Sequence, residues 1–433
     1  MCGYTITKNE ILNLTEHRGL TSVFKKTNYW NIWFNSLPLS SNGTRLEQPL
    51  KGKDFYLLFN GEIFNYKELE RGVFSDLDYL YKLVVRKGMN QLELYNESLK
   101  WDGFWSISII KENGDVFLFT DPLGKKQLYH SQDGISSEIK PLLVSEMPLI
   151  LPYNEKSFNT SQTPFQGIYR VLPGVLYCYK PKNQMAYAEG KRIYLNKSYQ
   201  AKESLVNLIS SSLRRRLENR IDGVTLLLSG GLDSSILLHH LCSYSKDFEI
   251  LTIENGETET VDDLCRKYQM PYRMISSEIT EEELTDAVHS YEHPLDYGSL
   301  IPNYLLFKES TNRVILTGDG ADEFFGGYNR NLKNDTWDYD VHYELPYYHN
   351  IRLDRLSMAF TKEVRSPLMS MPLYHFCRFI PYYLRMDKIY LRNAYRGLLP
   401  DFIIDGNKIP LRHKNDKAYN QNLIKNKFTQ LWS

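Results

Sequence analysis

The segment LLLSGGLDSS, which runs from Leu226 to Ser235, combines an apolar run with two glycines, three serines and one acid. The apolar run is typical of a buried strand, and a helix is expected to begin near Asp233. Glycine N–H groups can approach an anion closely, and a helix N-terminus adds partial positive charge. An acid in such a place makes sense if it holds a divalent cation. The spacing is not that of a Walker loop, so the segment predicts backbone binding of pyrophosphate, with a capped turn as the alternative.

A second glycine-rich segment, ILTGDGADEFFGGY at 315–328, also follows a predicted strand. It contains Asp319, Asp322 and Glu323, which are more clustered than a plain turn requires. Ligands of parallel sheets bind at the carboxyl ends of the strands. The segment therefore predicts acids that face Asp233 across one nucleotide and share a magnesium ion with it. A solvated acidic loop with glycine caps is the alternative.

The secondary structure predicted around these segments differs between the two halves of the chain. Up to about residue 190, short runs broken by turn residues predict a mainly β half. Its expected strands are 29–34, 55–59, 105–110, 116–120 and 175–179, with a helix over 76–87. From about residue 200, strands and helices alternate, which predicts an α/β parallel sheet. There the expected helices are 202–219, 234–243 and 258–268, and the expected strands are 224–228, 248–253 and 313–316.

These segments resemble those of a known family. SGGLDSS is similar to the pyrophosphate-binding loop of the ATP pyrophosphatases, and TGDGADEFFGGY to the acidic loop of their asparagine synthetase branch. Cys2 directly follows the first Met, and FNGEIFNY at 59–66 resembles the glutamine-site motif of class II glutamine amidotransferases. Further matches, in family order, are HRG (17–19), SD (75–76), DPLGKKQLY (121–129), SEIK (137–140), DYGSLIPNYLL (296–306), DRLSMAFTKEVRSPL (354–368) and LLP (398–400) followed by Lys408.

The resemblance to the glutamine-hydrolysing asparagine synthetase family implies two domains. Residues 1–195 are expected to form an α+β N-terminal nucleophile hydrolase-type sandwich, the class II glutamine amidotransferase domain. Residues 196–433 are expected to form an α/β parallel-sheet ATP-pyrophosphatase domain, the asparagine synthetase-type ATP-binding domain.

At the first site, removal of Met would make Cys2 the N-terminus. An α-amine with a pKa of about 7.7–8.0 can serve as base for the Cys2 thiol. The thiolate then attacks the glutamine amide and gives a thioester and ammonia. The resemblance implies an oxyanion hole formed by Asn60 and Gly61. It implies glutamine-binding residues at Leu37, Leu39, Asn60, Gly61, Glu62 and Asp76. An incidental cysteine and an Asn-Gly hairpin turn are the alternatives.

One position departs from the family pattern at this site. Ser36 stands where the family usually has an Arg that grips the glutamine carboxylate. Arg18 and Arg45 are the candidates to replace that Arg. If neither does so, free ammonia rather than glutamine is the expected nitrogen source.

At the second site, the resemblance implies that Mg-ATP binds and a carboxylate attacks the α-phosphorus, which gives an acyl-adenylate and pyrophosphate. Ammonia delivered between the domains then displaces AMP. The implied ATP-binding residues are Leu228, Ser229, Gly230, Gly231, Asp233, Ser234, Ser235, Ile253, Thr317 and Gly318, and the implied magnesium ligands are Asp233 and Asp322. Asp319, where strict asparagine synthetases usually have Glu, is expected to assist proton removal from the nitrogen. Lys408 matches the catalytic lysine of the family. Gly406 and Ser370 depart from the pattern.

Composition excludes several other classes. Lys plus Arg and Asp plus Glu number 52 each, so a nucleic-acid or membrane-surface binder is not expected. No apolar stretch is long enough to cross a membrane, and the N-terminus lacks the features of a secretory signal. The five cysteines are scattered and form no CxxC pair or zinc spacing. We therefore expect a reduced cytoplasmic protein with small-molecule substrates, and the family implies a homodimer.

The sequence thus predicts a glutamine-dependent asparagine synthetase that uses ATP and Mg²⁺. One alternative is an amide ligase of the same family that amidates a carboxylate on a sugar, a cell-wall precursor or a nucleotide-like metabolite. Another is a non-catalytic ATP-binding relative. The identity of the acceptor carboxylate distinguishes the two ligases.

Overall fold

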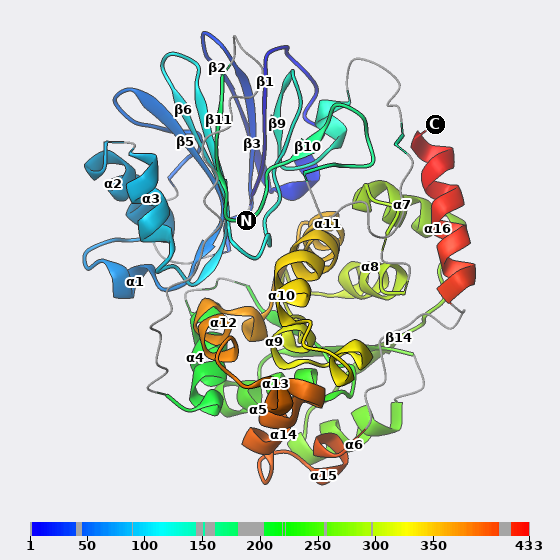
Figure 1. The fold of residues 1–433 in the computed structure, drawn as a ribbon. Helices are drawn as coiled ribbons and strands as arrows, with labels where there is room; N and C mark the ends of the chain where they lie inside the picture. Colours follow the sequence, from blue (N-terminus) through cyan, green and yellow to red (C-terminus); the bar gives the residue numbers. More distant parts are fainter. Residues whose placement is uncertain are drawn as a thin grey trace.

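The structure, a computed structural model, describes residues 2–39, 46–88, 90–143, 150–151, 161–180, 203–218, 220, 222–254, 258–295, 298–406 and 417–432. In them, two antiparallel sheets form the N-terminal half, and one parallel sheet with its helices forms the C-terminal half. Figure 1 shows the two halves one above the other. The two-part architecture predicted from the sequence is thereby confirmed. The predicted boundary after residue 195 lies outside the described residues and stays a prediction.

The N-terminal half is built from two facing sheets. The first has the order β10-β8-β9-β1-β3-β2, with β1 Cys2–Thr7, β2 Thr21–Lys26, β3 Asn31–Ser36, β8 Tyr129–His130, β9 Gly134–Ser136 and β10 Tyr169–Arg170. The second has the order β11-β7-β6-β5-β4, with β4 Leu50–Lys51, β5 Phe55–Ile63, β6 Gly103–Lys111, β7 Val116–Thr120 and β11 Leu176–Tyr179. Apolar residues of both inner faces, such as Ile32 and Leu118, share one core. The Tyr4 hydroxyl bonds the Ser108 hydroxyl across it over 2.9 Å.

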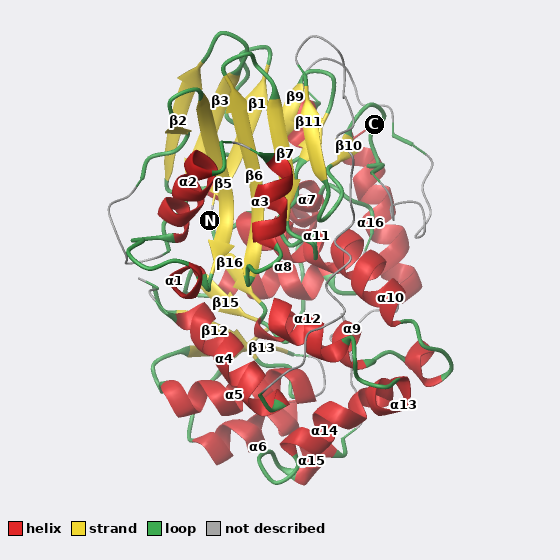
Figure 2. Ribbon diagram, turned by 60° about the vertical axis from the view of Figure 1, so that its left-hand side comes forward, coloured by secondary structure: helices red, strands yellow, loops and turns green. Residues whose placement is uncertain are grey.

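Two helices cover the outer face of the second sheet, as Figure 2 shows. Helix α2, Asp76–Arg86, begins after Ser75, whose hydroxyl accepts a hydrogen bond from the Asp78 N–H. Its apolar residues follow helical spacing and are buried, which is why the sequence predicted this helix well. Helix α3 spans Gln91–Ser98 and the single turn α1 spans Tyr66–Leu69. Two 3-10 turns, η1 Glu16–Arg18 and η2 Lys140–Leu142, complete this half.

The parallel sheet of the C-terminal half has the order β14-β13-β12-β15-β16. Its strands are β12 Val224–Leu227, β13 Glu249–Ile253, β14 Arg273–Ile275, β15 Val314–Leu316 and β16 Glu363–Arg365. Helices α4 Leu205–Leu217, α5 Leu232–Tyr244 and α6 Thr258–Tyr268 lie on one side. Helices α7 Glu281–Tyr291, α8 Leu300–Glu309 and α11 Asn350–Met358 lie on the other side, between this sheet and the N-terminal half (Figure 2).

Several short helices follow the second glycine-rich loop in the C-terminal half. They are α9 Ala321–Phe325, α10 Trp337–Tyr339, α12 Met371–Cys377, α13 Tyr382–Arg385, α14 Ile389–Tyr395 and α15 Asp401–Ile404. Between them lie the π-helical segment η4 Asp340–His349 and the 3-10 turns η3 Asn329–Leu332, η5 Pro367–Met369 and η6 Met386–Lys388. The last helix, α16 Lys417–Trp432, runs alongside α7 (Figure 1).

Buried ion pairs hold the two halves together. Asp354 of α11 accepts hydrogen bonds from Arg18 Nη2 at 3.1 and 3.0 Å and from Lys126 Nζ at 2.6 Å. All three side chains are almost fully buried. Burial opposes ionisation of Asp354, but Arg18 and Lys126 outweigh it and lower the pKa of this carboxyl. Three charges that satisfy one another in this way fix the position of α11 against the sandwich.

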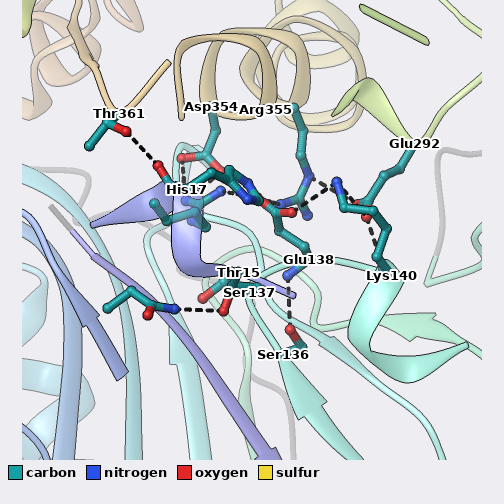
Figure 3. Close-up of polar contacts among 12 residues, drawn as sticks. Thr15, His17, Ser136, Ser137, Glu138, Lys140, Glu292, Asp354, Arg355 and Thr361 are labelled. Carbon is teal, nitrogen blue, oxygen red and sulfur yellow. Dashed lines mark hydrogen bonds and ion pairs between the residues drawn. The ribbon is translucent and has the colours of Figure 1, made fainter. Parts of the chain in front are cut away.

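A second group of charges continues the interface, as Figure 3 shows. The Arg355 guanidinium lies 3.4 Å from a Glu138 oxygen and 3.5 Å from a Glu292 oxygen. Glu138 also accepts from His17 at 2.9 Å, and Glu292 accepts from the Lys140 N–H at 2.8 Å. Two of these contacts, Arg355 with Glu138 and Lys140 with Glu292, join the N-terminal half to the C-terminal half.

Candidate active sites

Cys2 and Asn60 meet between the two sheets of the sandwich. Cys2 begins β1, and Asn60 lies in β5 of the facing sheet. The Cys2 N–H donates a hydrogen bond to Asn60 Oδ1 over 3.1 Å. The Asn60 side chain is fully buried, and among the described residues its Nδ2 has no hydrogen-bond partner. Buried donors are nearly always paired in proteins, so this N–H beside a thiol is available to an oxygen of a ligand.

Asn60 and Gly61 lie inside a strand. β5 continues to Ile63, beyond the predicted end at residue 59, and pairs Gly61 with Trp105 of β6. The hairpin-turn alternative for Asn-Gly is therefore wrong, because long-range pairing decides the conformation here. Gly61 has a φ of +153°, and a Cβ at this position would overlap the Phe104 carbonyl oxygen. Only glycine fits here, because the backbone of β6 packs directly against this position.

Ser36, the position that departs from the family pattern, lies beside the Cys2 thiol. Ser36 is the cross-strand neighbour of Cys2 in the β1–β3 pair. Burial raises the pKa of the Cys2 thiol, while the Leu37 N–H and the Ser36 hydroxyl act in the opposite direction. Leu37 and Leu39 are both buried just after β3. Pairing of β1 with β3 thus brings Ser36 and the predicted residue Leu37 beside the Cys2 thiol, and Leu39 follows two residues later.

Arg18 is committed elsewhere. Its guanidinium is fully buried, donates to the Cys2 carbonyl over 3.3 Å and binds Glu138 and Asp354 with its other nitrogens. It is therefore a poor replacement for the missing carboxylate-binding Arg. Arg45, the other candidate, lies outside the described residues.

Glu62 and Asp76 form an acidic pair near this thiol. Burial, together with Asp76, raises the pKa of Glu62 to about 8, and Arg365 acts against that rise. Burial also raises the pKa of Asp76 to about 6, although its carboxylate accepts hydrogen bonds from the Ile63 and Leu77 N–H groups at 3.1 and 2.9 Å. Two carboxyls held in this way favour a cationic group such as an ammonium as their ligand.

The predicted nucleotide residues come together in the C-terminal half. A cavity of about 580 Å³ lies at the carboxyl ends of β12, β13 and β15. Its lining includes Leu228, Ser229, Gly230, Gly231, Asp233, Ser234, Ile253, Thr317, Gly318, Asp319 and Asp322, all of which the sequence singled out. Ser235 is not in the lining, since it is buried and its hydroxyl donates to the Gly231 carbonyl over 2.8 Å.

The loop from Ser229 to Ser234 is ordered by its own hydroxyls. The Gly231 N–H donates to Ser229 Oγ over 3.3 Å, and the Ser229 N–H donates to Ser234 Oγ over 3.2 Å. Gly230 has a φ of +80°, which a residue with a Cβ adopts only at a cost. Helix α5 then begins at Leu232, so its N-terminus faces the cavity. This arrangement suits an anion such as a phosphate.

Lys388 was missed by the sequence analysis. Its ammonium lies 2.6 Å from Asp233 Oδ2 and 2.6 Å from Asp322 Oδ1. Burial disfavours the charge on Lys388, but the two acids outweigh burial and raise the pKa of its ammonium. The predicted metal ligands Asp233 and Asp322 thus lie close enough to share one cation, which fits them for a magnesium ion completed by phosphate oxygens.

The far wall of the cavity carries a second network that the sequence did not reveal. Arg352 Nη2 donates to Asp319 Oδ1 over 3.1 Å. His349 Nε2 and the Tyr328 hydroxyl lie 3.1 Å apart, and that hydroxyl donates to Glu323 over 2.6 Å. This wall thus offers the Arg352 cation together with the acids Asp319 and Glu323, which suits a small ligand that carries both charges.

Three further positions named from the sequence are Lys408, Gly406 and Ser370. Lys408 lies outside the described residues, so its role stays a prediction. Gly406 lines the cavity, whereas Ser370 is fully buried and its hydroxyl accepts from the Leu373 N–H at the start of α12. The change at Ser370 therefore affects a helix cap rather than the cavity wall.

Comparison with known proteins agrees with the division of the chain into two halves. A family model described as a glutamine amidotransferase domain matches residues 37–189. The model described as asparagine synthase matches residues 205–340 and 338–431, about half of the sequence. The chain belongs to the asparagine synthase family.

Similar curated proteins carry names from the same family. The chain is 25% identical over 317 residues to asparagine synthetase [glutamine-hydrolyzing] 1 of Bacillus subtilis, covering 65% of this chain and 49% of that protein. It is 25% identical over 351 residues to asparagine synthetase 2 of the same organism, covering 67% and 46%. The asparagine synthetase of Mesocricetus auratus is 24% identical over 433 residues, covering 84% and 71%. The chain thus spans about half the length of the Bacillus relatives. In the described part of the chain, no helix is long and apolar enough to span a membrane.

Proposed function

We propose that this chain is a glutamine-dependent asparagine synthetase that consumes ATP. One observation carries the proposal. A thiol with an unpaired donor beside it (Cys2 and Asn60) and a glycine-rich cavity with paired acids occur in the two halves of one chain. The first suits amide hydrolysis and the second suits carboxylate adenylation, and an amide ligase needs both. The expected domains are a hydrolase-type sandwich over 1–195 and an ATP-pyrophosphatase domain over 196–433, and the homodimer stays a prediction.

In the glutaminase half, Cys2 Sγ attacks the glutamine side-chain carbonyl carbon. The carbonyl oxygen becomes an oxyanion that Asn60 Nδ2 and the Gly61 N–H stabilise, and the C–N bond then breaks to release ammonia. Water hydrolyses the thioester and gives glutamate. Glu62 and Asp76 bind the α-ammonium of glutamine, and Glu62 must lose its proton to do so, because burial raises its pKa to about 8.

In the synthetase half, an oxygen of the aspartate β-carboxylate attacks the α-phosphorus of ATP. The bond to pyrophosphate breaks, and a β-aspartyl adenylate remains. The backbone of the Ser229–Ser235 loop holds the phosphates, and the nucleoside lies against Leu228, Ile253, Thr317 and Gly318. Asp233 and Asp322 would hold magnesium, which neutralises phosphate charge when bound.

Ammonia then attacks the acyl carbon of the adenylate, AMP leaves, and the nitrogen loses a proton. Asp319 is suited to take that proton, because Arg352 holds its carboxylate in the cavity. Lys408 is proposed to stabilise charge on the phosphate.

A small cavity of about 20 Å³ supports transfer of ammonia between the halves. Phe104 and Lys126 line it from the N-terminal half, and Val364 and Ser366 line it from the C-terminal half. The Ser366 hydroxyl lies 3.1 Å from that of Thr317, which lines the nucleotide cavity. We therefore propose that the path of ammonia between the two sites runs along this part of the interface.

The test is incubation of the protein with ATP, magnesium, glutamine and aspartate, with pyrophosphate, AMP and asparagine measured together. We expect the three products in equal amounts. Pyrophosphate that forms only with a different carboxylate would identify an amide ligase for that carboxylate. Absence of pyrophosphate with every acceptor, despite ATP binding, would contradict a catalytic role.

A further inference from the structure

The Lys388 ammonium occupies the place between the two proposed magnesium ligands. It lies 2.6 Å from Asp233 Oδ2 and 2.6 Å from Asp322 Oδ1. Lys388 is only 5% exposed, whereas the two acid side chains are 21% and 22% exposed at the cavity wall. All three residues line the cavity, and the lysine is the most deeply buried of them.

The backbone around Lys388 has an unusual conformation that places its side chain between the two acids. Asp387 and Lys388 have φ values of +49° and +57°, in the left-handed region that residues with a Cβ rarely adopt. The Asp387 N–H donates to the Gly326 carbonyl over 3.0 Å, which ties this turn to the acidic loop. A Cβ on Gly327 would overlap both the Lys388 side chain and Asp322. Residues in the left-handed region cost free energy and cluster at active sites and ligand clamps, which directs attention to a functional role for this turn.

A magnesium ion and this ammonium need the same two oxygens. Two cations a few ångströms apart repel each other, so they cannot both lie between Asp233 and Asp322. We propose that Lys388 is a placeholder that keeps magnesium out of the site until ATP arrives. The triphosphate brings further oxygens for the metal and a new anionic partner for the displaced ammonium. The inference rests on the proposed function in that it takes Asp233 and Asp322 as metal ligands.

This exchange has a consequence for the order of binding. The free enzyme is expected to bind magnesium weakly, and the metal enters as Mg-ATP. Without the lysine, two carboxylates would face each other across the loop and bind any divalent cation from solution. Lys388 is thus a positioning residue that holds the acids at the separation that the metal later uses.

The experiment measures binding of Mn²⁺, a magnesium analogue visible by electron paramagnetic resonance, to the full chain without nucleotide. Lys388→Met removes the charge at similar side-chain length. We expect it to bind Mn²⁺ at least about tenfold more tightly than the unchanged protein, a difference of about 1.4 kcal/mol. Arg396→Met is the matched control, since it removes one positive charge from an exposed pair with Asp405. Circular dichroism checks that each variant is folded.

Equal Mn²⁺ affinities in the unchanged and Lys388→Met proteins would overturn the inference. Tight Mn²⁺ binding by the unchanged protein without nucleotide would overturn it too, and that arm needs no variant. Adding Asp322→Asn to Lys388→Met should abolish the gained binding. If it does not, the metal assignment itself fails. Turnover is not measured in any arm, so a failure of the synthetase proposal is seen separately in the product assay.

Discussion

The Arg365 guanidinium lies 3.5 Å from the Glu62 carboxylate, although Arg365 ends β16 of the parallel sheet and Glu62 lies in β5 of the sandwich. The Arg365 carbonyl accepts a hydrogen bond from the Thr317 N–H over 3.2 Å. Thr317 lines the cavity that is proposed to bind the nucleotide. One residue of the interface therefore contacts the proposed glutamine pocket with its side chain and the nucleotide loop with its backbone.

Replacing Arg365 should shift the pH dependence of glutamine use. Glu62 must be ionised to bind the glutamine ammonium, and Arg365 lowers the pKa that burial and Asp76 have raised to about 8. Arg365→Met removes this influence, so the pKa of Glu62 rises further and the acid limb of kcat/KM for glutamine moves to higher pH. At neutral pH, kcat/KM should fall about tenfold, or about 1.4 kcal/mol. Glutaminase rates across pH measure it.

Two controls accompany the Arg365→Met experiment. Ammonia-dependent synthesis, compared with the unchanged protein at each pH, should lack the shifted limb. Arg365→Lys, which keeps the charge, should retain most of the original profile. An acid limb that stays in place or moves to lower pH would show that Glu62 is not the titrating group.

Glu62 should also make the fold less stable in alkali. The pKa of Glu62 is about 8 in the folded protein and about 4.3 in the unfolded chain. Its contribution to stability is therefore complete below about pH 4.3 and is lost as the pH rises toward 8. Glu62→Gln removes the ionisation. The Tm of the variant relative to the unchanged protein should therefore increase between pH 5 and pH 9, by about 2–4 °C per kcal/mol. A Tm difference that is constant over this range would contradict the raised pKa.

Cys2→Ala should separate the two proposed reactions. It removes the nucleophile, so glutamine-dependent asparagine synthesis should fall by at least roughly 1000-fold. Ammonia-dependent synthesis should remain, because no described contact of the nucleotide cavity involves Cys2. Cys178→Ala is the control, since Cys178 lies in β11 and should leave both rates unchanged. Loss of both activities in Cys2→Ala would contradict the two-site assignment.

The sequence predicted those features that depend on local patterns. The strand–loop–helix around Asp233 and the helical spacing of α2 are local, and the structure has both. The conformation of Asn60 and Gly61 is not local, because pairing with β6 turns a strong hairpin signal into a strand interior. The resemblance singled out Asn60 and Gly61 without predicting the reason that a glycine is needed at position 61.

Lys388 and Arg365 carry no local signal. Lys388 reaches the cavity because the turn at Asp387 packs against Gly326, which lies far away in the sequence. Arg365 contacts Glu62 because the two halves dock, and docking depends on buried pairs such as Arg18 with Asp354. Such contacts depend on tertiary packing, which one sequence does not encode in any short pattern.

Asp354 should be the key charge of that docking. Asp354→Asn keeps the size of the side chain but leaves Lys126 buried without its paired carboxylate and Arg18 with Glu138 alone. The free energy of unfolding should fall by about 3–5 kcal/mol, and differential scanning calorimetry should show two separated transitions as the halves uncouple. Asp263→Asn breaks an exposed pair with Arg266 and should leave the Tm unchanged. One sharp transition at the original Tm in Asp354→Asn would contradict this role.

Gly318→Ala tests the fit of the nucleotide loop. A Cβ on Gly318 would lie 2.9 Å from Asp233 Cβ and 3.2 Å from the Ser234 nitrogen, so it must push the loop that is proposed to hold pyrophosphate. Overpacking of this kind costs about 1–3 kcal/mol, and we expect ATP affinity to fall about tenfold or more. The Kd of a non-hydrolysable ATP analogue, measured by calorimetry, reports it, and glutaminase activity should not change. Gly298→Ala is the matched control, because a Cβ there meets no described atom within 4 Å. Equal nucleotide affinity in the two variants would mean that ATP does not lie against this loop.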